Sequence, residues 1–267
     1  MFDFPSKSSM LGRSVLITGA NGFLGSKISV LMAELGAFVL LLDHPDSNFN
    51  KTLDLLGKIP DARYQAIDCD LSDETSRNKV IDSLCGSLQS LHCLINNAAF
   101  VGSSALSGWS VEFPRQSLSS WRSALEVNLT APFHLSQGFA ELMRKSKGSN
   151  IINISSIYGS LGPDWSLYEG TQMANPAAYS VSKGGLMQLT RWLSTTLSPD
   201  IRVNSISPGG IYRSQDDIFV DRYSSRCPLN RMATEDDLLG AVLFLATDLS
   251  GYVTGENIDV DGGWSKW

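Results

Sequence analysis

Tyr179 and Lys183 form a Tyr-x-x-x-Lys pair, and two serines, Ser155 and Ser156, follow the apolar run that precedes it. Residues four apart on a helix share one face, so the lysine is placed beside the phenol. A tyrosine has a pKa of about 10, so acid/base work near pH 7 requires about 4 kcal/mol of preferential stabilisation of the anion. A desolvated ammonium together with a cationic cofactor ring would supply it. Alone, the pair is a weak signal.

The residues around this pair predict the helix that must hold it. Asn175 is a favourable N-cap, Pro176 suits the first helical position, and no breaker follows until Ser198 and Pro199. We therefore expect one long helix that presents the tyrosine and the lysine on the same side.

The composition indicates one globular domain over residues 1–267. Hydrophobic residues make up 43% of the chain and charged residues 18%, which suits a packed core and excludes a disordered chain. The formal net charge is -6, with 21 lysines and arginines against 27 aspartates and glutamates, so no polycationic surface is expected. We expect a small-molecule substrate, with neither nucleic acid nor a membrane as the main partner.

The cysteines, the histidines and the first ten residues bear on location and metal binding. Residues 1–10 lack the apolar core of a signal peptide, and no later apolar run approaches the length of a membrane span. The cysteines show neither metal-ligand spacing nor the density of a disulfide scaffold, and the histidines lie in separate segments. We expect a cytoplasmic protein without a metal. These residues are Cys69, Cys85, Cys93, Cys227, His44, His92 and His134.

Short apolar runs alternate with longer amphipathic segments along the chain. Near-continuous β-branched and leucine runs separated by helices predict a Rossmann-type α/β fold, a doubly wound parallel sheet of about seven strands flanked by helices. Residues 12–150 form mainly the dinucleotide-binding half, and residues 151–267 the catalytic and substrate-binding half. The predicted strands are Ser14–Thr18, Ala37–Leu42, Arg63–Ile67, Leu91–Ile95, Ile151–Ile154, Ile201–Ile206 and Asn257–Val260.

Two stretches rich in Gly, Ser, Pro and Trp interrupt this rhythm, Val101–Ser117 and Gly159–Asn175. Each follows the carboxyl end of a predicted strand, where open parallel sheets bind ligands.

A glycine cluster between the first strand and its helix predicts a dinucleotide site. Glycines there allow a tight turn and let backbone N–H groups and the helix N-terminus approach a pyrophosphate. The second strand ends at Asp43, whose carboxylate would bind the two ribose hydroxyls and repel a 2′-phosphate. This favours NAD as the cofactor over NADP, although the neighbouring His44 would soften the rejection. The cluster is Gly19, Asn21, Gly22, Phe23, Leu24 and Gly25.

Further motifs occur in a characteristic order, and with them nearly the whole chain resembles the short-chain dehydrogenase/reductase family. They are the glycine loop, Asn96-Asn97-Ala98-Ala99, Asn128, Ser156, Tyr179, Lys183, Pro208-Gly209 and Val260-Asp261-Gly262-Gly263. Their joint occurrence is highly specific.

The resemblance implies roles for individual residues. Tyr179 would be the general acid/base, Ser156 would orient the substrate oxygen, and Lys183 would lower the pKa of the tyrosine and hold the nicotinamide ribose. Asn128 would anchor a water that connects the lysine to solvent, and Ser155 is the alternative serine. Cofactor contacts would come from the glycine cluster, Asp43, Asp70, Leu71, Asn97, Ala98, Tyr179, Lys183, Pro208, Gly209 and Ile211.

The chain departs from the family pattern in three places. The glycine spacing Thr-Gly-x-x-Gly-x-x-Gly is similar to the extended branch, which contains nucleotide-sugar epimerases and dehydratases. Ser156 and Tyr179 are 23 residues apart, about ten more than the family norm. Arg213 stands where the family's Pro-Gly-x-x-x-Thr motif places a threonine near the nicotinamide amide. Ser214 would replace that contact, or Arg213 would pair with a substrate carboxylate or phosphate.

The extra residues include Trp165, Tyr168 and Glu169, a mixture of aromatic and hydrogen-bonding groups that suits a carbohydrate ring. The alternative is a surface flap or a subunit contact. The segment also resembles sugar-modification enzymes of the flagellin-modification and nonulosonic-acid type.

The expected function is therefore an NAD(P)-dependent oxidoreductase that interconverts a secondary alcohol and a ketone, with a carbohydrate substrate. A redox-neutral nucleotide-sugar epimerase or dehydratase and a non-catalytic NAD-binding regulator remain alternatives. The resemblance also implies a homo-oligomer, a dimer or homotetramer, through helices around residues 120–145 and 177–197. Trp192 and Phe139 are candidate contacts, although core packing is the alternative for each.

Overall fold

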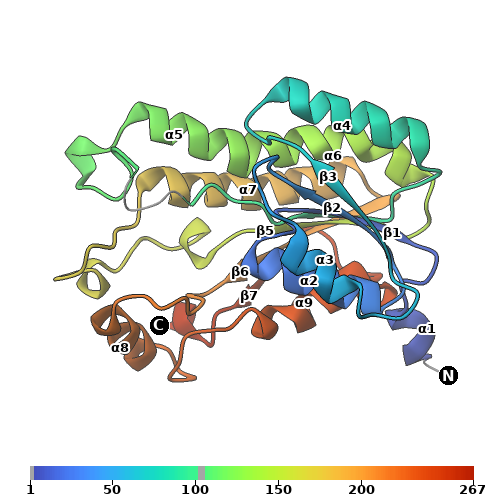
Figure 1. Ribbon diagram of the computed structural model, residues 1–267. Coiled ribbons are helices and arrows are strands. Elements are labelled where there is room, and N and C mark those ends of the chain that lie inside the picture. Colours follow the sequence, from blue (N-terminus) through green and yellow to red (C-terminus); the bar gives the residue numbers. More distant parts are fainter. Residues whose placement is uncertain (1–2, 102–105) are drawn as a thin grey trace.

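The computed structural model describes residues 3–101 and 106–267 and confirms the doubly wound α/β fold (Figure 1). Seven parallel strands form one sheet in the order β3-β2-β1-β4-β5-β6-β7. The strands are β1 (Ser14–Thr18), β2 (Phe38–Asp43), β3 (Arg63–Asp68), β4 (Cys93–Asn96), β5 (Ser149–Ile154), β6 (Ile201–Pro208) and β7 (Asn257–Val260).

The seven predicted strands are the seven observed ones, with shifted ends. The fourth begins two residues later than predicted, at Cys93, and the fifth begins two residues earlier, at Ser149. Strands β1, β4 and β5 are buried at every position, which fits the apolar centres of β1 and β4 and the isoleucines of β5. Edge strand β3 is largely exposed and correspondingly polar.

Helices cover both faces of the sheet (Figure 1). On one face, α2 and α9 pack on β1, β2, β5, β6 and β7, and on the other α6 and α7 pack on β4, β5 and β6. Each face has its own apolar core. The helices are α1 (Phe4–Ser8), α2 (Phe23–Glu34), α3 (Asn50–Leu56), α4 (Glu74–Ser87), α5 (Leu118–Leu125), α6 (Ala131–Arg144), α7 (Ala177–Thr196), α8 (Asp217–Arg226) and α9 (Asp236–Ala246).

Shorter helical segments lie mostly in the connections. They are η1 (Phe113–Arg115), the π-helical η2 (Glu126–Thr130), η3 (Ile157–Gly159), η4 (Trp165–Leu167), η5 (Asp248–Ser250) and η6 (Trp264–Lys266). None of the helices within residues 3–101 and 106–267 combines the length and apolar character needed to cross a membrane.

Helix α7 begins one residue later than predicted. Pro176 is its N-cap, and the Asn175 side chain accepts a hydrogen bond from Ser180 Oγ at 3.1 Å rather than from a backbone N–H. Pro176 has the φ of −67° that its ring imposes, but its ψ of 141° is extended, so the helix starts at the next residue.

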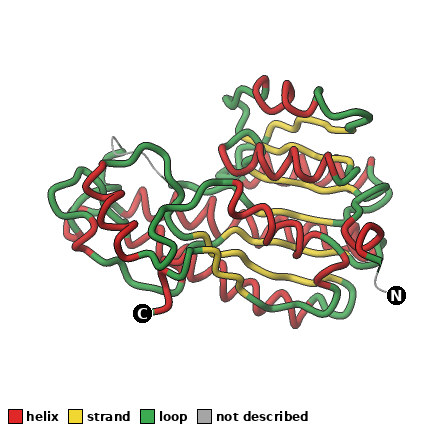
Figure 2. Tube along the Cα trace, turned by 90° about the horizontal axis from the view of Figure 1, so that it is seen from below, coloured by secondary structure: helices red, strands yellow, loops and turns green. Residues whose placement is uncertain are grey.

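Both interrupting stretches lie at the same end of the sheet, but the structure describes only one of them completely. Residues 102–105 of the predicted stretch Val101–Ser117 are outside the described residues, whereas Gly159–Asn175 is described throughout. The view in Figure 2 shows helices and loops without strands extending past one end of the sheet, and this part contains α8. The candidate site lies where that part meets the strands.

A substitution at Phe139 tests how tightly the core beneath α6 is packed. Its side chain is completely buried, whereas Phe133 on the same helix is 40% exposed. We expect Phe139→Ala to lower the free energy of unfolding by about 3–5 kcal/mol, because it removes a large apolar side chain from a packed core. Phe133→Ala should cost less than about 1 kcal/mol. Urea denaturation of both variants measures the difference, and equal costs would contradict this description of the core.

Candidate active site

The structure brings Ser156, Tyr179 and Lys183 together at a pocket of about 300 Å³ beyond the carboxyl ends of β5 and β6, which we call the catalytic pocket. Pro208, Gly209 and Ile211, predicted as cofactor contacts, line the same pocket. Ser156 follows β5, the residues from Pro208 onward lie at the end of β6 or after it, and α7 is the crossover helix between these two strands, so the sheet topology brings the distant segments to one edge.

Ser156 is positioned by the turn that follows β5. Its backbone is extended, with φ −167° and ψ 154°, and its Oγ accepts a hydrogen bond from Tyr158 N at 3.2 Å. The hydroxyl proton of Ser156 is thus available for another acceptor. Ser155 Oγ instead donates to the Lys183 carbonyl at 3.0 Å, so its proton is already used. This difference favours Ser156 over Ser155 for the predicted serine role.

Tyr179 and Lys183 lie on one face of α7, as the spacing predicts. Lys183 Nζ is 5.9 Å from the centre of the Tyr179 ring and donates a hydrogen bond to the Ile154 carbonyl at 2.7 Å. Lys183 is 2% exposed. Because burial disfavours the cation, the pKa of this ammonium falls to about 8.

The pKa of Tyr179 lies above its ordinary value in this structure. Burial raises it, whereas hydrogen bonding with Ser156 and the positive charge of Arg213 oppose the rise. The phenol therefore carries its proton at neutral pH, the form that can act as an acid. The predicted lowering of this pKa by Lys183 stays a prediction.

Asn128 lies in η2, between α5 and α6, and its side chain is held by protein groups. Its Oδ1 accepts from Phe100 N at 2.6 Å, and its Nδ2 donates to the Phe100 carbonyl and to Ser182 Oγ. These bonds tie the segment after β4 to α7, next to Lys183. The predicted role of Asn128 in anchoring a water stays a prediction.

The predicted glycine cluster lines a second cavity of about 320 Å³, the cofactor groove. Gly19 has φ +63°, and a Cβ there would lie 2.8 Å from the Ala98 Cα. A Cβ on Gly25 would lie 1.9 Å from the Gly19 carbonyl oxygen. The groove keeps its shape only without side chains at these positions, which fits the close approach of a pyrophosphate to the backbone.

Asp43 lies at the end of β2 and borders the cofactor groove together with Asn97 and Ala98. Its carboxylate accepts hydrogen bonds from Asn21 N, from Ser47 Oγ and from His44 N, each at 2.8 Å. The carboxylate is thereby fixed against the glycine-rich turn, where a ribose of a dinucleotide would lie.

The other predicted adenine contacts lie at the margin of this region. The Asp70 carboxylate accepts hydrogen bonds from the backbone and hydroxyl of Ser72, and these bonds hold the pKa of Asp70 below its usual value. The same carboxylate lies 3.9 Å from His44 Nε2. Leu71 is buried in the core. Neither residue is among those that line the cofactor groove.

The predicted substrate residues Trp165, Tyr168 and Glu169 do not line the catalytic pocket. Trp165 and Tyr168 border a separate cavity of about 940 Å³ between residues 110–116 and 163–181, and Glu169 is exposed. The inserted segment packs on α8 instead. Trp165, Tyr168 and Phe219 make successive aromatic contacts, with ring centres 5.8 and 5.4 Å apart.

Ionic and polar contacts strengthen this attachment of the insertion to α8. Arg226 forms an ion pair with Asp164, and Arg222 Nη1 donates to the Glu169 carbonyl at 2.6 Å. The aromatic series continues through Tyr223 to Trp264. These contacts show that the insertion packs on α8 within the protomer. Both interpretations of the insertion, a carbohydrate site and a surface flap or subunit contact, stay predictions.

Sequence reasoning missed the aromatic side chains of the catalytic pocket, Tyr158, Phe219 and Tyr223. Tyr158 lies only two positions after Ser156, and this short separation could have identified it as a pocket residue. Phe219 and Tyr223 lie on α8, and the sequence does not indicate where the loop between β6 and α8 places this helix. Within residues 3–101 and 106–267, no group of three or more His, Cys, Asp or Glu side chains could hold a metal ion.

Comparisons with known proteins agree with this geometry. The family model described as "Enoyl-(Acyl carrier protein) reductase" matches residues 19–265. The chain is 28% identical to "Post-translational flagellin modification protein A" of Campylobacter coli, over 94% of this chain and 97% of that protein. It is 33% identical to "Probable galactose dehydrogenase GalD" of Rhizobium meliloti, over 94% of each.

The fold is also similar to a solved structure from Beutenbergia cavernae, a "putative NAD(P) dependent gluconate 5-dehydrogenase" with bound NADP. The TM-score is 0.84 and the identity 29%, covering 98% of this chain and 100% of that one. Because that structure holds NADP, the likeness does not decide between NAD and NADP.

The phenol of Tyr179 makes the reaction depend on pH. Because its pKa is raised, the phenolate that accepts a proton during alcohol oxidation becomes more abundant as pH rises. We expect kcat/KM for oxidation to increase by about tenfold per pH unit from pH 6 toward the pKa of the phenol, whereas kcat/KM for carbonyl reduction stays flat over that range and falls only above that pKa. Initial rates from pH 6 to 10 measure both. A flat oxidation profile would contradict a titrating tyrosine.

Proposed function

The chain belongs to the short-chain dehydrogenase/reductase family of oxidoreductases, and from this membership we propose that it uses NAD(P) to interconvert a secondary alcohol and a ketone on a sugar or sugar derivative. One observation carries the proposal. The catalytic pocket adjoins the cofactor groove, and the two share Leu24, Asn97, Ala99 and Arg213 as lining residues. A dinucleotide in the groove would thus reach the pocket that contains Tyr179.

The chain's own residues supply orientation and proton transfer. When bound, the nicotinamide of NAD(P) supplies or accepts the hydride. In reduction, Tyr179 donates its proton to the carbonyl oxygen, and the free hydroxyl proton of Ser156 is hydrogen-bonded to the same oxygen. Lys183, charged below a pKa of about 8, stabilises the remaining phenolate. In oxidation these roles reverse.

Polar side chains at two cavities support a substrate with several oxygen atoms: Tyr158 lines the catalytic pocket, and Tyr168 and Asn175 border the cavity of about 940 Å³. Tyr158 and Tyr168 join their hydroxyls at 2.7 Å, and burial raises the pKa of both phenols, so both stay protonated. The hydrogen bond between them uses one hydroxyl proton, so the other hydroxyl proton can be donated to a ligand. The nearby Asn175 is 6% exposed, and its Nδ2 has no partner among the described residues. Buried donors of this kind favour a ligand oxygen, because leaving them unpaired costs about 1–3 kcal/mol.

The names of the relatives point the same way, since a flagellin modification protein, a galactose dehydrogenase and a gluconate 5-dehydrogenase are among them. We also propose that the protein is cytoplasmic, which its four free cysteines support, and that it forms a dimer or tetramer. Exposed apolar side chains on α5 and α7, from Leu118, Val181 and Trp192, support self-association.

The first experiment measures NADH or NADPH formation with galactose, gluconate, mannonate, amino sugars and nucleotide sugars. We expect turnover of one sugar class, lost by at least about 10³-fold in Tyr179→Phe because the proton acceptor is removed. Tyr158→Phe should retain the hydride step but raise KM for the sugar by about tenfold. The variant Ser160→Ala, at an exposed position in the same connection, serves as a control.

Three outcomes would contradict the proposal. Equal activity of wild type and Tyr179→Phe would revive the non-catalytic regulator. Conversion of a nucleotide sugar without net change in NADH would favour the epimerase or dehydratase. Turnover confined to carbonyl compounds without further hydroxyl groups would overturn the sugar class.

We further propose that the enzyme prefers NAD, because the Asp43 carboxylate faces the region where a 2′-phosphate of NADP would lie. Asp43→Ala should reduce the ratio of kcat/KM for NAD to that for NADP by about 10- to 100-fold, since it removes the ribose contact and the charge repulsion. Asp46→Ala, an exposed carboxylate three residues on, is the matched control. An unchanged ratio in Asp43→Ala would exclude this residue as the selector.

A further inference from the structure

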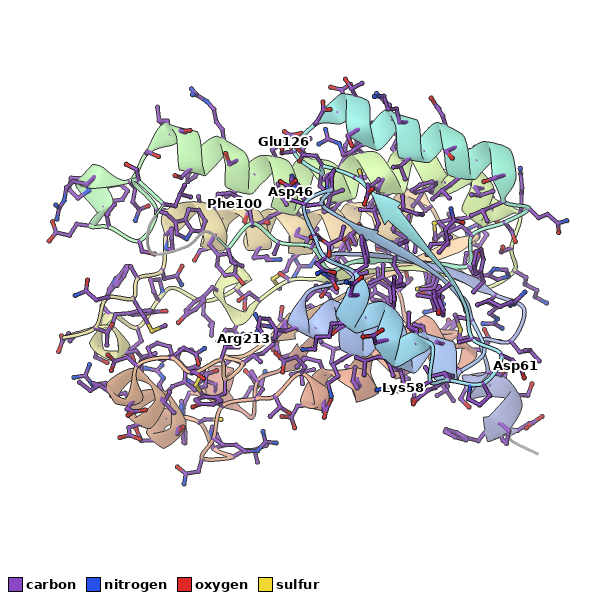
Figure 3. All side chains as sticks on the ribbon, in the orientation of Figure 1. Asp46, Lys58, Asp61, Phe100, Glu126 and Arg213 are labelled. Atoms are coloured by element: carbon purple, nitrogen blue, oxygen red, sulfur yellow. The ribbon has the colours of Figure 1, made fainter. Side chains whose placement is uncertain are left out.

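Arg213 lies where the cofactor groove meets the catalytic pocket and borders both cavities (Figure 3). It follows β6 by five residues, on the chain that leads to α8. Its side chain is 40% exposed, so the guanidinium is reachable by a ligand. The sequence suggested that it binds a carboxylate or phosphate of the substrate, but its contacts lie on the cofactor side.

Phe23, the first residue of α2, is the platform on which Arg213 lies. The guanidinium carbon is 4.7 Å from the centre of the phenyl ring, a cation–π contact. Phe23 directly follows the glycine-rich turn and is 65% exposed. Arg213 therefore reaches across from the β6 connection to the turn that would hold the pyrophosphate.

Two further contacts fix the arginine in this position. Its Nε donates to Glu235 Oε1 at 3.1 Å, immediately before α9. Its backbone N–H donates to Gln215 Oε1 at 2.7 Å, and Gln215 Nε2 in turn donates to the Ile211 carbonyl at 2.8 Å. Ser214 adopts φ +56°, a conformation that is uncommon for residues other than glycine and that completes this tight loop.

The terminal nitrogens of Arg213 remain available. In the described part of the chain, hydrogen bonds engage its backbone nitrogen and its Nε but neither Nη1 nor Nη2. These two nitrogens carry four N–H donors in a planar fork, the geometry that binds two phosphate oxygens at once. The N-terminus of α2 adds positive potential at the same place.

We propose that Arg213 is a clasp for the pyrophosphate of NAD(P), with Phe23 as its platform and Glu235 as its anchor. The inference rests on the proposed use of NAD(P) and names a cofactor contact that replaces the threonine expected at this place. Because Arg213 also borders the catalytic pocket, the clasp would lie between the part of the groove that holds the pyrophosphate and the pocket that holds the nicotinamide.

Binding measurements test the clasp without any substrate. NADH fluorescence gives Kd, and ADP-ribose and AMP compete as probes with and without a pyrophosphate. We expect Arg213→Ala and Arg213→Gln to weaken NADH and ADP-ribose by about tenfold or more and to leave AMP unchanged. Arg213→Lys should recover part of the loss, and Phe23→Ala should weaken NADH by about two- to fivefold. Arg191→Ala, an exposed arginine on α7, controls for the lost charge.

The outcomes separate this inference from the proposed function. Wild-type affinity for NADH and ADP-ribose in Arg213→Ala would overturn the clasp. If Arg213→Ala kept wild-type affinity for NADH but lost kcat/KM for gluconate more than for galactose, Arg213 would be assigned to the carboxylate of the substrate. If the wild-type protein bound neither NADH nor NADPH, the proposed function itself would fail. Circular dichroism melting shows whether each variant is folded.

Discussion

The buried ammonium of Lys183 is the constraint on which the site depends. A lysine cation removed from water is costly unless it is paired, and within residues 3–101 and 106–267 the one hydrogen-bond acceptor of Lys183 Nζ is the Ile154 carbonyl at 2.7 Å. That carbonyl is the last of β5, so the lysine joins α7 to the end of a central strand. Ser155 reinforces the joint by donating to the Lys183 backbone. Tyr179 and Ser156 face each other because this joint sets the distance between helix and strand.

The parallel sheet makes that joint possible and places the cofactor groove beside it. Strands β1, β4, β5 and β6 end at one edge, so the turns after them meet although they are far apart in the chain. Asn128 adds a link across this edge, because its side chain bonds the segment after β4 and the Ser182 hydroxyl on α7. The proton-transfer residues are thus carried by rigid elements, and the parts that vary are the connections.

The sequence predicted what local patterns determine. Short runs rich in apolar and β-branched residues identified the strands, because buried parallel strands are apolar on both faces, although the edge strand β3 is exposed and polar. The Tyr-x-x-x-Lys spacing placed Tyr179 and Lys183 on one face, because helix geometry alone decides that. The surroundings of Trp165, Tyr168 and Arg213 depend on long-range packing, which no local spacing encodes. Tyr168 packs on Phe219, 51 positions away, and Arg213 packs on Phe23, 190 positions away.

The packing of the insertion on α8 explains how residues outside the catalytic pocket can affect its selectivity. Phe219 and Tyr223 line the pocket, and they belong to the same aromatic series as Trp165 and Tyr168. A displacement of α8 would break these ring contacts and the ion pair between Asp164 and Arg226, unless the insertion moved with it. The extra residues between Ser156 and Tyr179 are therefore coupled, through α8, to the wall of the catalytic pocket. In the proposed enzyme this paired unit shapes the pocket, whereas the strand ends and α7 hold the residues proposed for proton transfer.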